Sequence, residues 1–468
     1  PLAKRRNDPT PMQLFLNGEW NGLSDTAEVV NPYDGSVIDT VPCASPAEIT
    51  SAIDGLARGA QAMRNMAAHQ RVDILRKAAS LMRERQEKLG RLISTEEGKV
   101  LAEGHIEAGR AAETIDLSAD EARALHGETV PLDSTPGGVG KLGFTLRVPC
   151  GIVAAITPFN FPMNLVAHKV GPAIAAGNAV LLKPASDTPL SALKLVEILL
   201  EAGLPAEAIA CITGPGAALG QAICTDPRVR KISFTGSTEV GSKIMKLAAD
   251  DIKRVSLELG GKSPNIVFAD ADWQRAAAES PMSVFANTGQ DCCARSRMFI
   301  EQPIFNDFVN QFVAATESLK IGDPTNDETQ IGPMVSAAQR EISESFVVKA
   351  RDAGRDIRTG GERQGEHGFY LNPAVITGVK TSDRAWCEEI FGPVVCLRPF
   401  TDEAKMLQEV NDTNFGLSGS IWSRDLSRAL RVARRVESGV ISINTHSSVH
   451  TEAPFGGFKR SGLGRDLG

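Results

Sequence analysis

The chain of 468 residues is poor in tyrosine and tryptophan, with 2 and 4 residues, and aromatic residues make up only 5% of it. Basic residues are not in surplus either, because 57 acidic residues outweigh 50 basic ones and leave a net charge of −7. A general nucleic-acid partner requires clustered Lys and Arg to neutralise phosphates. The composition therefore argues against a nucleic-acid partner.

Long hydrophobic runs are also missing. No window holds 18 apolar residues without a charge, and no signal-peptide pattern opens the chain. We therefore expect no membrane partner and a soluble, cytoplasmic protein. The basic run Lys4-Arg5-Arg6 is short and soon followed by Pro9, which predicts a disordered tail.

The 8 cysteines form no C-x-x-C pair and no Cys/His cluster. Structural zinc sites need such spacings, so we predict that the protein uses no metal. A chain of this length has room for two or three lobes with sizeable cores, and it does not need disulfides for stability. The thiols are expected to be reduced.

The usual nucleotide-binding loops are absent. Gly214-Pro215-Gly216 is followed by a glycine only at position 220, which does not fit G-x-G-x-x-G. The stretch from Gly236 to Gly241 is followed by Ser242-Lys243, which reverses the Lys-Ser/Thr order of a P-loop. We therefore do not expect a nucleoside-triphosphate site.

What the chain does contain is an alternation of strands and helices. Residues 12–45 predict short strands, a capped start at Ser45-Pro46 predicts helices to about residue 126, and residues 129–150 predict strand again. Buried strands at 151–156, 178–183, 208–213 and 231–234 are separated by helices, and a second alternating region spans 262–440. This pattern is typical of an α/β fold with a doubly wound parallel sheet, which binds ligands beyond the carboxyl ends of its strands.

A pair of cysteines lies on a polar loop, Gly289-Gln290-Asp291-Cys292-Cys293, with Arg295 and Arg297 close behind. The thiolate is the reactive form of cysteine, and nearby cations or helix amides lower the thiol pKa. The loop therefore offers a candidate nucleophile. The alternative is that two core cysteines are adjacent in sequence, the commoner fate of free cysteine.

Three other features could support that chemistry. Glu258 is a single acid in an apolar strand, where it is either paired or kept at a raised pKa; a pKa of roughly 6–7 would suit a general base, and the alternative is a solvated strand end. Asn160 ends a buried strand and could donate to an oxyanion, or simply cap a loop. Gly236-Ser237 opens a helix after a strand, which suits a phosphate or a structural turn.

Taken in order along the chain, these motifs resemble those of the aldehyde dehydrogenase superfamily. The motifs that carry the resemblance are Asn160, Lys183, Gly236-Ser237-Thr238-Glu239-Val240-Gly241, Glu258-Leu259-Gly260-Gly261-Lys262, Gly289-Gln290-Asp291-Cys292, Glu389-Ile390-Phe391-Gly392-Pro393 and Pro454-Phe455-Gly456-Gly457-Phe458-Lys459-Arg460-Ser461-Gly462. The resemblance runs from Leu14 to Gly468. Each motif is weak alone, and the set in register is specific.

The resemblance implies three structural parts. These are a doubly wound parallel-sheet dinucleotide-binding domain (1–128 and 147–260), an α/β catalytic domain (261–455) and a small β oligomerisation element (129–146 and 456–468). The resemblance also implies a homodimer or homotetramer. In relatives the C-terminal tail crosses between subunits and usually continues past the last of these motifs. Whether the homo-oligomer is a dimer or a tetramer therefore stays open.

The resemblance also implies a mechanism in which an aldehyde is oxidised to an acid through a thioester. Cys292 matches the nucleophile and Cys293 the neighbour that is usually not essential. Asn160 and the backbone N–H of Cys292 would stabilise the oxyanion, and Glu258 would activate the hydrolytic water. Small-molecule aldehydes are the implied substrates.

NAD or NADP is the implied cofactor. The positions that match cofactor contacts in the family are Ile156, Thr157, Pro158, Phe159, Lys183, Ser186, Gly216, Gly220, Phe234, Thr235, Gly236, Ser237, Val240, Leu259, Glu389 and Phe391. Strongly NAD-preferring relatives often carry a glutamate where this chain has Ser186. A carboxylate repels a 2′-phosphate and serine does not, so we expect NADP to be used at least as well as NAD.

The substrate residues implied by the resemblance are Arg110, His168, Asp291 and Cys293, together with the polar loop 445–451. Arg110 would meet an anionic aldehyde, and His168 stands where succinate-semialdehyde enzymes tend to carry arginine. Asp291 would favour a neutral or cationic aldehyde instead. The alternatives are that Arg110 and Asp291 pair with each other or face solvent. A lactaldehyde-like, semialdehyde or aminoaldehyde substrate remains open.

Two other functions remain alternatives. A CoA-acylating enzyme would resolve the thioester with CoA, but acylating relatives generally lack the base that Glu258 provides. A non-catalytic structural relative would not need Cys292, Glu258 and Asn160 together.

Overall fold

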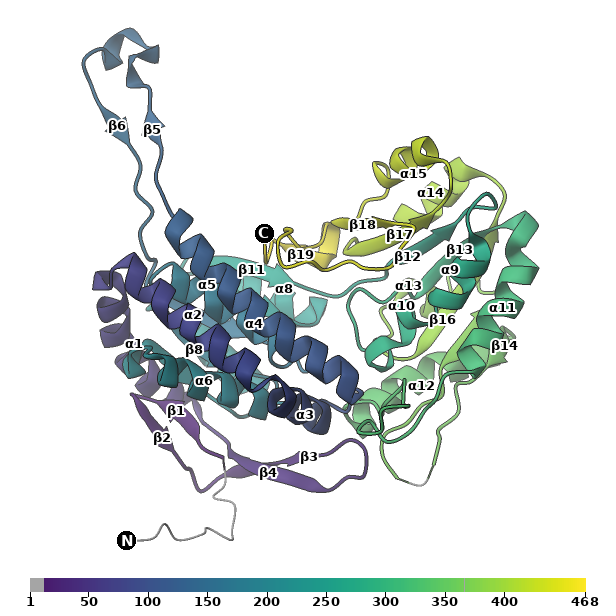
Figure 1. The fold of residues 1–468 in the computed structure, drawn as a ribbon, viewed down its shortest axis with the longest axis horizontal. Helices are drawn as coiled ribbons and strands as arrows, with labels where there is room; N and C mark the ends of the chain where they lie inside the picture. The colour runs from purple at the N-terminus through teal and green to yellow at the C-terminus, as the bar shows by residue number, and fades with distance from the viewer. Residues whose placement is uncertain (1–11, 366) are drawn as a thin grey trace.

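The computed structural model describes residues 12–365 and 367–468, so the predicted tail at Lys4-Arg5-Arg6 lies outside the described residues. Two large sheets, one of eight strands and one of seven, form the cores of two lobes (Figure 1). Short strands also form two separate hairpins. The protein has the α/β fold that the sequence predicts.

The eight-stranded sheet has a parallel centre with antiparallel edges. In spatial order its strands are β19 (Gly462–Leu463), β11 (Arg254–Glu258), β10 (Val229–Thr235), β7 (Ile152–Ile156), β8 (Ala179–Lys183), β9 (Ile209–Cys211), β1 (Leu14–Leu16) and β2 (Glu19–Asn21). The four buried strands predicted between residues 151 and 234 are all present. The C-terminal strand β19 returns to this sheet and pairs with β11.

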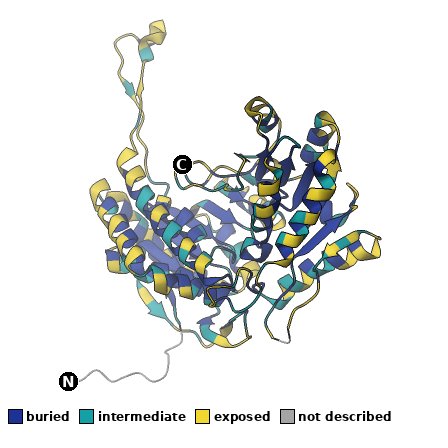
Figure 2. Ribbon diagram, turned by 45° about the vertical axis from the view of Figure 1, so that its right-hand side comes forward, coloured by how far each residue is buried: buried dark blue, intermediate teal, exposed yellow. Residues whose placement is uncertain are grey.

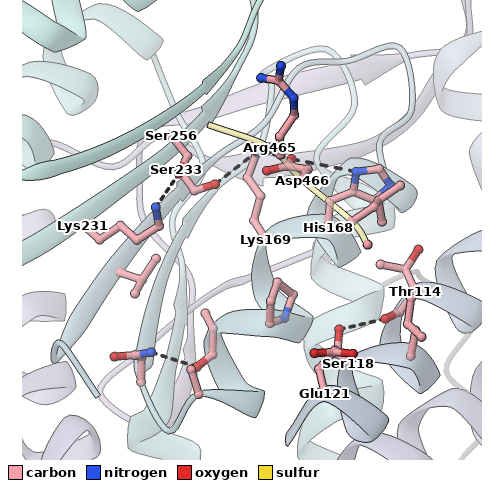
Figure 3. A pocket seen from close by; sticks show the side chains of 18 residues that line it. Thr114, Ser118, Glu121, His168, Lys169, Lys231, Ser233, Ser256, Arg465 and Asp466 are labelled. Carbon is pink, nitrogen blue, oxygen red and sulfur yellow. Dashed lines mark hydrogen bonds and ion pairs between the residues drawn. The ribbon is translucent and has the colours of Figure 1, made fainter. Parts of the chain in front are cut away.

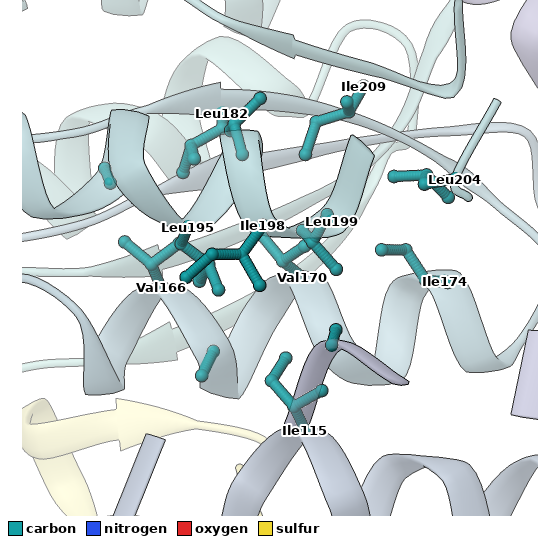
Figure 4. Close-up of a cluster of buried hydrophobic side chains, with 14 of the residues drawn as sticks. Ile115, Val166, Val170, Ile174, Leu182, Leu195, Ile198, Leu199, Leu204 and Ile209 are labelled. Carbon is teal, nitrogen blue, oxygen red and sulfur yellow. The ribbon is translucent and has the colours of Figure 1, made fainter. Parts of the chain in front are cut away.

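Helices cover both faces of this sheet. They are α1 (Pro46–Asn65), α2 (Ala68–Glu84), α3 (Gln86–Glu97), α4 (Leu101–Ala124), α5 (Asn164–Ala175), α6 (Leu190–Ala202), α7 (Gly216–Thr225) and α8 (Thr238–Ala248). Alternate residues of strand β8 enter different cores: Val180 and Leu182 belong to the core with α5 and α6, and Leu181 belongs to the core on the opposite face. Figure 4 shows Leu182 packed with Val166 and Val170 of α5 and with Leu195 and Leu199 of α6. Burial on both faces explains the continuous apolar strands.

The seven-stranded sheet carries the rest of the second alternating region. Its order is β14 (Asp356–Thr359), β15 (Ala374–Thr377), β16 (Val394–Phe400), β13 (Arg297–Glu301), β12 (Pro264–Val267), β17 (Ser418–Trp422) and β18 (Val440–Ile443). Only the edge strand β14 is antiparallel to its neighbour within this sheet. The flanking helices are α9 (Trp273–Glu279), α10 (Met282–Phe285), α11 (Phe305–Glu317), α12 (Ala337–Asp352), α13 (Arg384–Cys387), α14 (Glu403–Asn411) and α15 (Leu426–Ala433).

Two hairpins complete the structure. One joins β3 (Thr26–Val30) and β4 (Val37–Pro42), and the other joins β5 (Thr129–Val130) and β6 (Gly143–Phe144) and projects away from both lobes (Figure 1). The strand predicted at 129–150 is shorter than expected, since two 3₁₀ turns at 132–134 and 136–138 occupy its centre. Proline and glycine in this segment interrupt a regular ladder. Across the described ranges, no helix is both long and apolar enough to cross a membrane.

The parallel strands bring distant motifs to one edge of the first sheet. Asn160 follows β7, Gly236 follows β10, and Glu258 ends β11. Since parallel strands have their carboxyl ends on the same side, these motifs gather where ligands bind in such sheets.

Candidate active site

The turn before the cysteine pair has an uncommon backbone. Asn287 and Thr288 have φ angles of 49° and 54°, and Gly289 follows with a φ of 72°. The left-handed region is unfavourable for a β-branched residue such as threonine, and it persists only where the surroundings fix it. Gly289 is also needed for space, because a Cβ there would lie 2.2 Å from the carbonyl oxygen of Gly392.

Contacts from other segments hold this turn. The backbone N–H of Asn287 donates to both carboxylate oxygens of Glu103 on α4, at 3.1 and 3.2 Å. The hydroxyl of Thr288 donates to the carbonyl of Gly332 at 3.0 Å. The side-chain oxygen of Gln290 accepts from the N–H of Val335 at 3.0 Å. The loop that carries Cys292 is therefore anchored in both lobes.

Asn160 is oriented onto the same turn. Its side-chain nitrogen donates to the carbonyl of Gln290 at 2.8 Å. Its own carbonyl accepts from Lys99 Nζ at 2.6 Å and from the Asn287 side chain at 3.0 Å. An amide nitrogen has two hydrogens, so one stays available for a ligand. The geometry suits the oxyanion role that the sequence predicts.

The two thiols differ in burial. Cys293 is buried, and its backbone N–H donates to the Asp291 carboxylate at 2.8 Å, whereas Cys292 is half-buried and lines a cavity. The pKa of Cys292 is raised well above its ordinary value by a hydrogen bond with Cys293, by burial and by the negative neighbours Asp291 and Glu389. The protein alone thus favours the neutral thiol, in contrast to a loop that lowers the pKa.

A metal is not expected from the sequence, and that expectation stays a prediction. In the described part of the chain, Asp291, Cys292 and Cys293 form the only group of potential ligands whose atoms all lie within 4.8 Å of one another. These are three consecutive residues that include the candidate nucleophile.

Glu258 is buried at the end of β11, with 4% of its surface exposed, and neither carboxylate oxygen has a hydrogen-bond partner among the described residues. Burial and, to a smaller extent, the negative charge of Asp466 raise its pKa to about 9, while Lys169 and Arg465 oppose the shift. This value lies above the roughly 6–7 that would suit a general base, because Glu258 is buried and is not a solvated strand end. Glu258 is therefore protonated at neutral pH.

Charged groups lie next to Glu258 on the side of β19. Lys169 Nζ lies 3.3 Å from the carboxylate of Asp466 and 3.4 Å from the hydroxyl of Ser233. All three residues line a cavity of about 310 Å³ (Figure 3). His168 lines this cavity too, with its Nδ1 3.9 Å from Asp466. Burial lowers the pKa of His168 to about 4, so its ring is neutral at pH 7.

The candidate substrate residues are therefore not all together. His168 lies in the cavity beside Asp466, whereas Cys292 lines a different cavity. Arg110 Nη2 donates to the carbonyl of Val449 at 2.6 Å, while the Asp291 carboxylate accepts from the Cys293 N–H. Among the described residues, Arg110 and Asp291 therefore do not form the ion pair that was considered as an alternative.

The cavity at Cys292 has a volume of about 510 Å³ and is lined by residues of both lobes. Its lining includes ten of the predicted site residues: Pro158, Phe159, Asn160, Thr235, Gly236, Ser237, Leu259, Cys292, Glu389 and Phe391. The rings of Phe159 and Phe391 meet edge to face at 5.6 Å. Glu389 accepts from the N–H of Gly261 at 2.8 Å, and burial raises its pKa to about 7.

The start of α8 opens into this cavity. Ser237 caps the helix by accepting from the N–H of Val240 at 3.3 Å, and Gly236 precedes it. Helix N-termini attract anions through free N–H groups and the helix dipole. Together with apolar walls and Glu389, this donor set fits a dinucleotide with a pyrophosphate and a hydroxylated ribose.

The remaining predicted cofactor residues lie further along the strand ends. Lys183 Nζ donates to the carbonyl of Pro184 at 2.9 Å, and a Cβ at Gly216 would lie 4.0 Å from that nitrogen. Ser186 donates to the carbonyl of Gly214 at 3.1 Å in a cleft of about 270 Å³. The predicted residues Ile156, Thr157, Phe234, Val240 and Gly220 are not in the lining of either cavity.

Sequence reasoning missed the charged residues under the turn. Lys99 forms a buried ion pair with Glu107 at 2.8 Å, and Glu107 also accepts from the N–H of Asn164 at 3.1 Å, at the start of α5. Glu103 and Glu107 are four residues apart in a helix, so they share a face. This spacing could have indicated a shared acidic face on α4, although charged residues at this spacing usually lie on a solvent-exposed face.

Comparisons with known proteins agree with this geometry. The sequence model described as "Aldehyde dehydrogenase family" matches residues 20–468. The chain belongs to the aldehyde dehydrogenase family. It is 39% identical to 3-sulfolactaldehyde dehydrogenase of Priestia megaterium, covering 97% of this chain and 94% of that protein. It is also 39% identical, with the same coverage, to succinate-semialdehyde dehydrogenase [NADP(+)] of Escherichia coli.

A solved structure supports the same assignment. The crystal structure of an NAD-dependent aldehyde dehydrogenase from Sinorhizobium meliloti matches with a TM-score of 0.95 and 37% identity, covering 100% of this chain and 94% of that chain. This aldehyde dehydrogenase is therefore an NAD(P)-dependent oxidoreductase. These relatives give no support to the CoA-acylating alternative.

Proposed function

We propose that this enzyme oxidises a small polar aldehyde to its carboxylic acid through a thioester on Cys292. The observation that carries the proposal is the shared cavity of Cys292, Asn160, the start of α8 and Glu389. A bound NAD or NADP would lie along α8 and Glu389 and supply a hydride acceptor. The nucleophile, an amide donor and a dinucleotide cradle thus meet in one cavity.

The protein groups then divide the reaction. The Cys292 thiol loses its proton to solvent, its sulfur attacks the aldehyde carbon, and the new oxyanion accepts hydrogen bonds from the Asn160 amide and the Cys292 N–H. After the carbon has lost its hydride, Glu258 takes a proton from water, which attacks the thioester and releases the acid and the thiol. A single oxyanion donor contributes about 100- to 1000-fold in rate.

The buried position of Glu258 raises a question of proton transfer. A carboxyl with a pKa of about 9 is a poor base at pH 7 unless it ionises during turnover. The positive charges of Lys169 and Arg465 lower this pKa and would stabilise the ionised carboxylate, whereas the negative Asp466 raises it. We infer that Glu258 acts with these neighbours.

The substrate class rests on named relatives and on polar residues. The relatives named above are called sulfolactaldehyde and succinate-semialdehyde dehydrogenases, and both names denote short polar aldehydes. We propose an acidic semialdehyde or a lactaldehyde-like compound. An aminoaldehyde is the second candidate, since Asp291 places an acid beside Cys292.

One experiment tests the function. Reduction of NAD and NADP is followed by absorbance with succinate semialdehyde, lactaldehyde, 4-aminobutanal and a long alkyl aldehyde, each with and without CoA. We expect turnover without CoA and higher kcat/KM for the short polar aldehydes. Turnover only with CoA would exclude the hydrolytic mechanism, and no turnover with any aldehyde would exclude the function.

The cofactor preference gives a separate prediction. Ser186 lies on the surface next to Gly214, where a carboxylate would repel a 2′-phosphate. We expect kcat/KM for NADP to be at least equal to that for NAD, and Ser186→Glu to lower the NADP value by about tenfold or more while the NAD value is retained. A wild-type preference for NAD above about 100-fold, which corresponds to about 2.7 kcal/mol, would contradict this.

The projecting hairpin predicts a homo-oligomer. Most of this hairpin is exposed (Figure 2). Leu142 and Leu146 are 80% and 73% exposed, and Phe144 between them is 64% exposed. Exposed apolar segments of this kind mark interaction sites. We propose that the hairpin and the β19 region contact a second copy of the chain. Phe144→Asp combined with Leu146→Asp is expected to reduce the mass seen by light scattering, and an unchanged mass would contradict the proposal.

A further inference from the structure

Arg295 occupies an unusual place between the cysteine loop and the polar loop that follows β18. It is 1% exposed although it carries a charge. Its guanidinium donates to the carbonyl of Cys293, to the hydroxyl of Ser420 on β17 at 2.8 Å, and to the hydroxyl of Ser448 at 2.6 Å. Longer hydrogen bonds reach the carbonyls of Gly419 at 3.3 Å and His446 at 3.4 Å.

These partners explain how the charge is tolerated. Burying a guanidinium is costly unless its N–H groups are hydrogen-bonded. Here the described partners are all neutral oxygens, so the position of Arg295 is fixed by five directed contacts and not by an ion pair. The planar guanidinium of arginine carries N–H donors in fixed directions, which suits a set of acceptors that surrounds it in this way.

The loop that Arg295 holds lies against the nucleophile. Val449 packs on the apolar group formed by Cys293, Leu417 and Phe455, which Cys292 also contacts. Arg110 of α4 donates to the carbonyl of Val449 at 2.6 Å. Arg295 binds both Cys293 and Ser448. This single side chain therefore fixes the distance between the cysteine loop and residues 446–449.

We propose that Arg295 is a positioning residue that determines which aldehydes reach Cys292, by holding residues 446–449 against the cysteine loop. The proposal rests on the proposed function, since it assigns specificity within that site. Arg295 does not bind the aldehyde itself, because its N–H groups are already engaged. A looser contact would widen the space beside Cys292 and admit bulkier aldehydes.

Arg295→Lys is the main test, because lysine keeps the charge and loses the fork. Arg297→Lys is the matched control. Arg297 is also 1% exposed, and it donates to the carbonyls of Lys262 at 3.1 Å, Glu409 at 3.3 Å and Val410 at 2.9 Å, none of which belongs to residues 446–449. Both variants lose a buried guanidinium from the same segment. Ser448→Ala, which removes one partner from a half-buried loop residue, serves if Arg295→Lys does not fold.

The measured quantity is the ratio of kcat/KM for succinate semialdehyde to kcat/KM for phenylacetaldehyde. We expect Arg295→Lys to lower this ratio by about tenfold, Ser448→Ala to lower it by less, and Arg297→Lys to leave it unchanged. The rate of Cys292 alkylation by iodoacetamide should rise most in Arg295→Lys and less in Ser448→Ala, and it should stay unchanged in Arg297→Lys. An unchanged ratio in Arg295→Lys, or an equal change in Arg297→Lys, overturns the proposal. A wild-type enzyme that oxidises neither aldehyde would instead refute the proposed function.

Discussion

Replacing Cys292 with serine is expected to lower kcat for aldehyde oxidation on the order of 10⁴- to 10⁶-fold, the range seen when a central catalytic group is removed. The hydroxyl is a far weaker nucleophile than a thiolate, and no other residue in the cavity replaces it. The measurement is steady-state reduction of the dinucleotide, together with mass spectrometry of the trapped thioester. Binding of NADPH, followed by fluorescence, should be unchanged, since the cradle at α8 and Glu389 stays intact.

Cys293→Ser is the matched control for this experiment. The neighbouring thiol is 6% exposed and packs on Leu417 and Phe455, so its loss should affect stability more than chemistry. A hydroxyl in this apolar group costs about 1–3 kcal/mol if it finds no partner. If Cys293→Ser lost activity as completely as Cys292→Ser, the assignment of a single nucleophile would be wrong.

Glu258→Gln is expected to slow steady-state turnover by about 100- to 10,000-fold, the usual contribution of a general base. The first turnover should still form the thioester, because attack by Cys292 and hydride loss do not use Glu258. A rapid burst of reduced dinucleotide followed by slow turnover is the expected signature. Loss of the burst as well would show that Glu258 is needed before hydrolysis.

The pH dependence follows from the same carboxyl. Its pKa is raised from 4.5 to about 9, so the ionised base becomes more abundant as the pH rises, and wild-type turnover should increase between pH 7 and 9. Glu258→Gln should lose this dependence in the hydrolytic step. In wild type the folded state holds this proton more tightly than the unfolded chain, so this group's contribution to stability falls as the pH rises from 4.5 to about 9. The Tm of Glu258→Gln relative to wild type should therefore increase over that range.

The main α/β features could be predicted from local pattern. The apolar strands at 151–156 and 178–183 appear as β7 and β8, and Ser45 caps α1 with Glu48 as a capping box. Such features depend on neighbours within one turn or one strand. The segment 129–150 was predicted less well, because β5 and β6 are held as a hairpin away from the cores and not by a hydrophobic pattern.

The sequence by itself determined the family, the identity of the candidate nucleophile and the chemistry of its partners, since the motifs around Cys292, Glu258 and Asn160 are local and ordered. Only the tertiary structure decided how those groups are tuned. Burial behind β19 raises the pKa of Glu258, and Glu103 of α4 anchors the turn before the cysteines. Arg295 acquires its role from Ser420 and Ser448, more than a hundred residues away. Desolvation and long-range hydrogen bonds depend on what packs around a group, and no local sequence pattern specifies that.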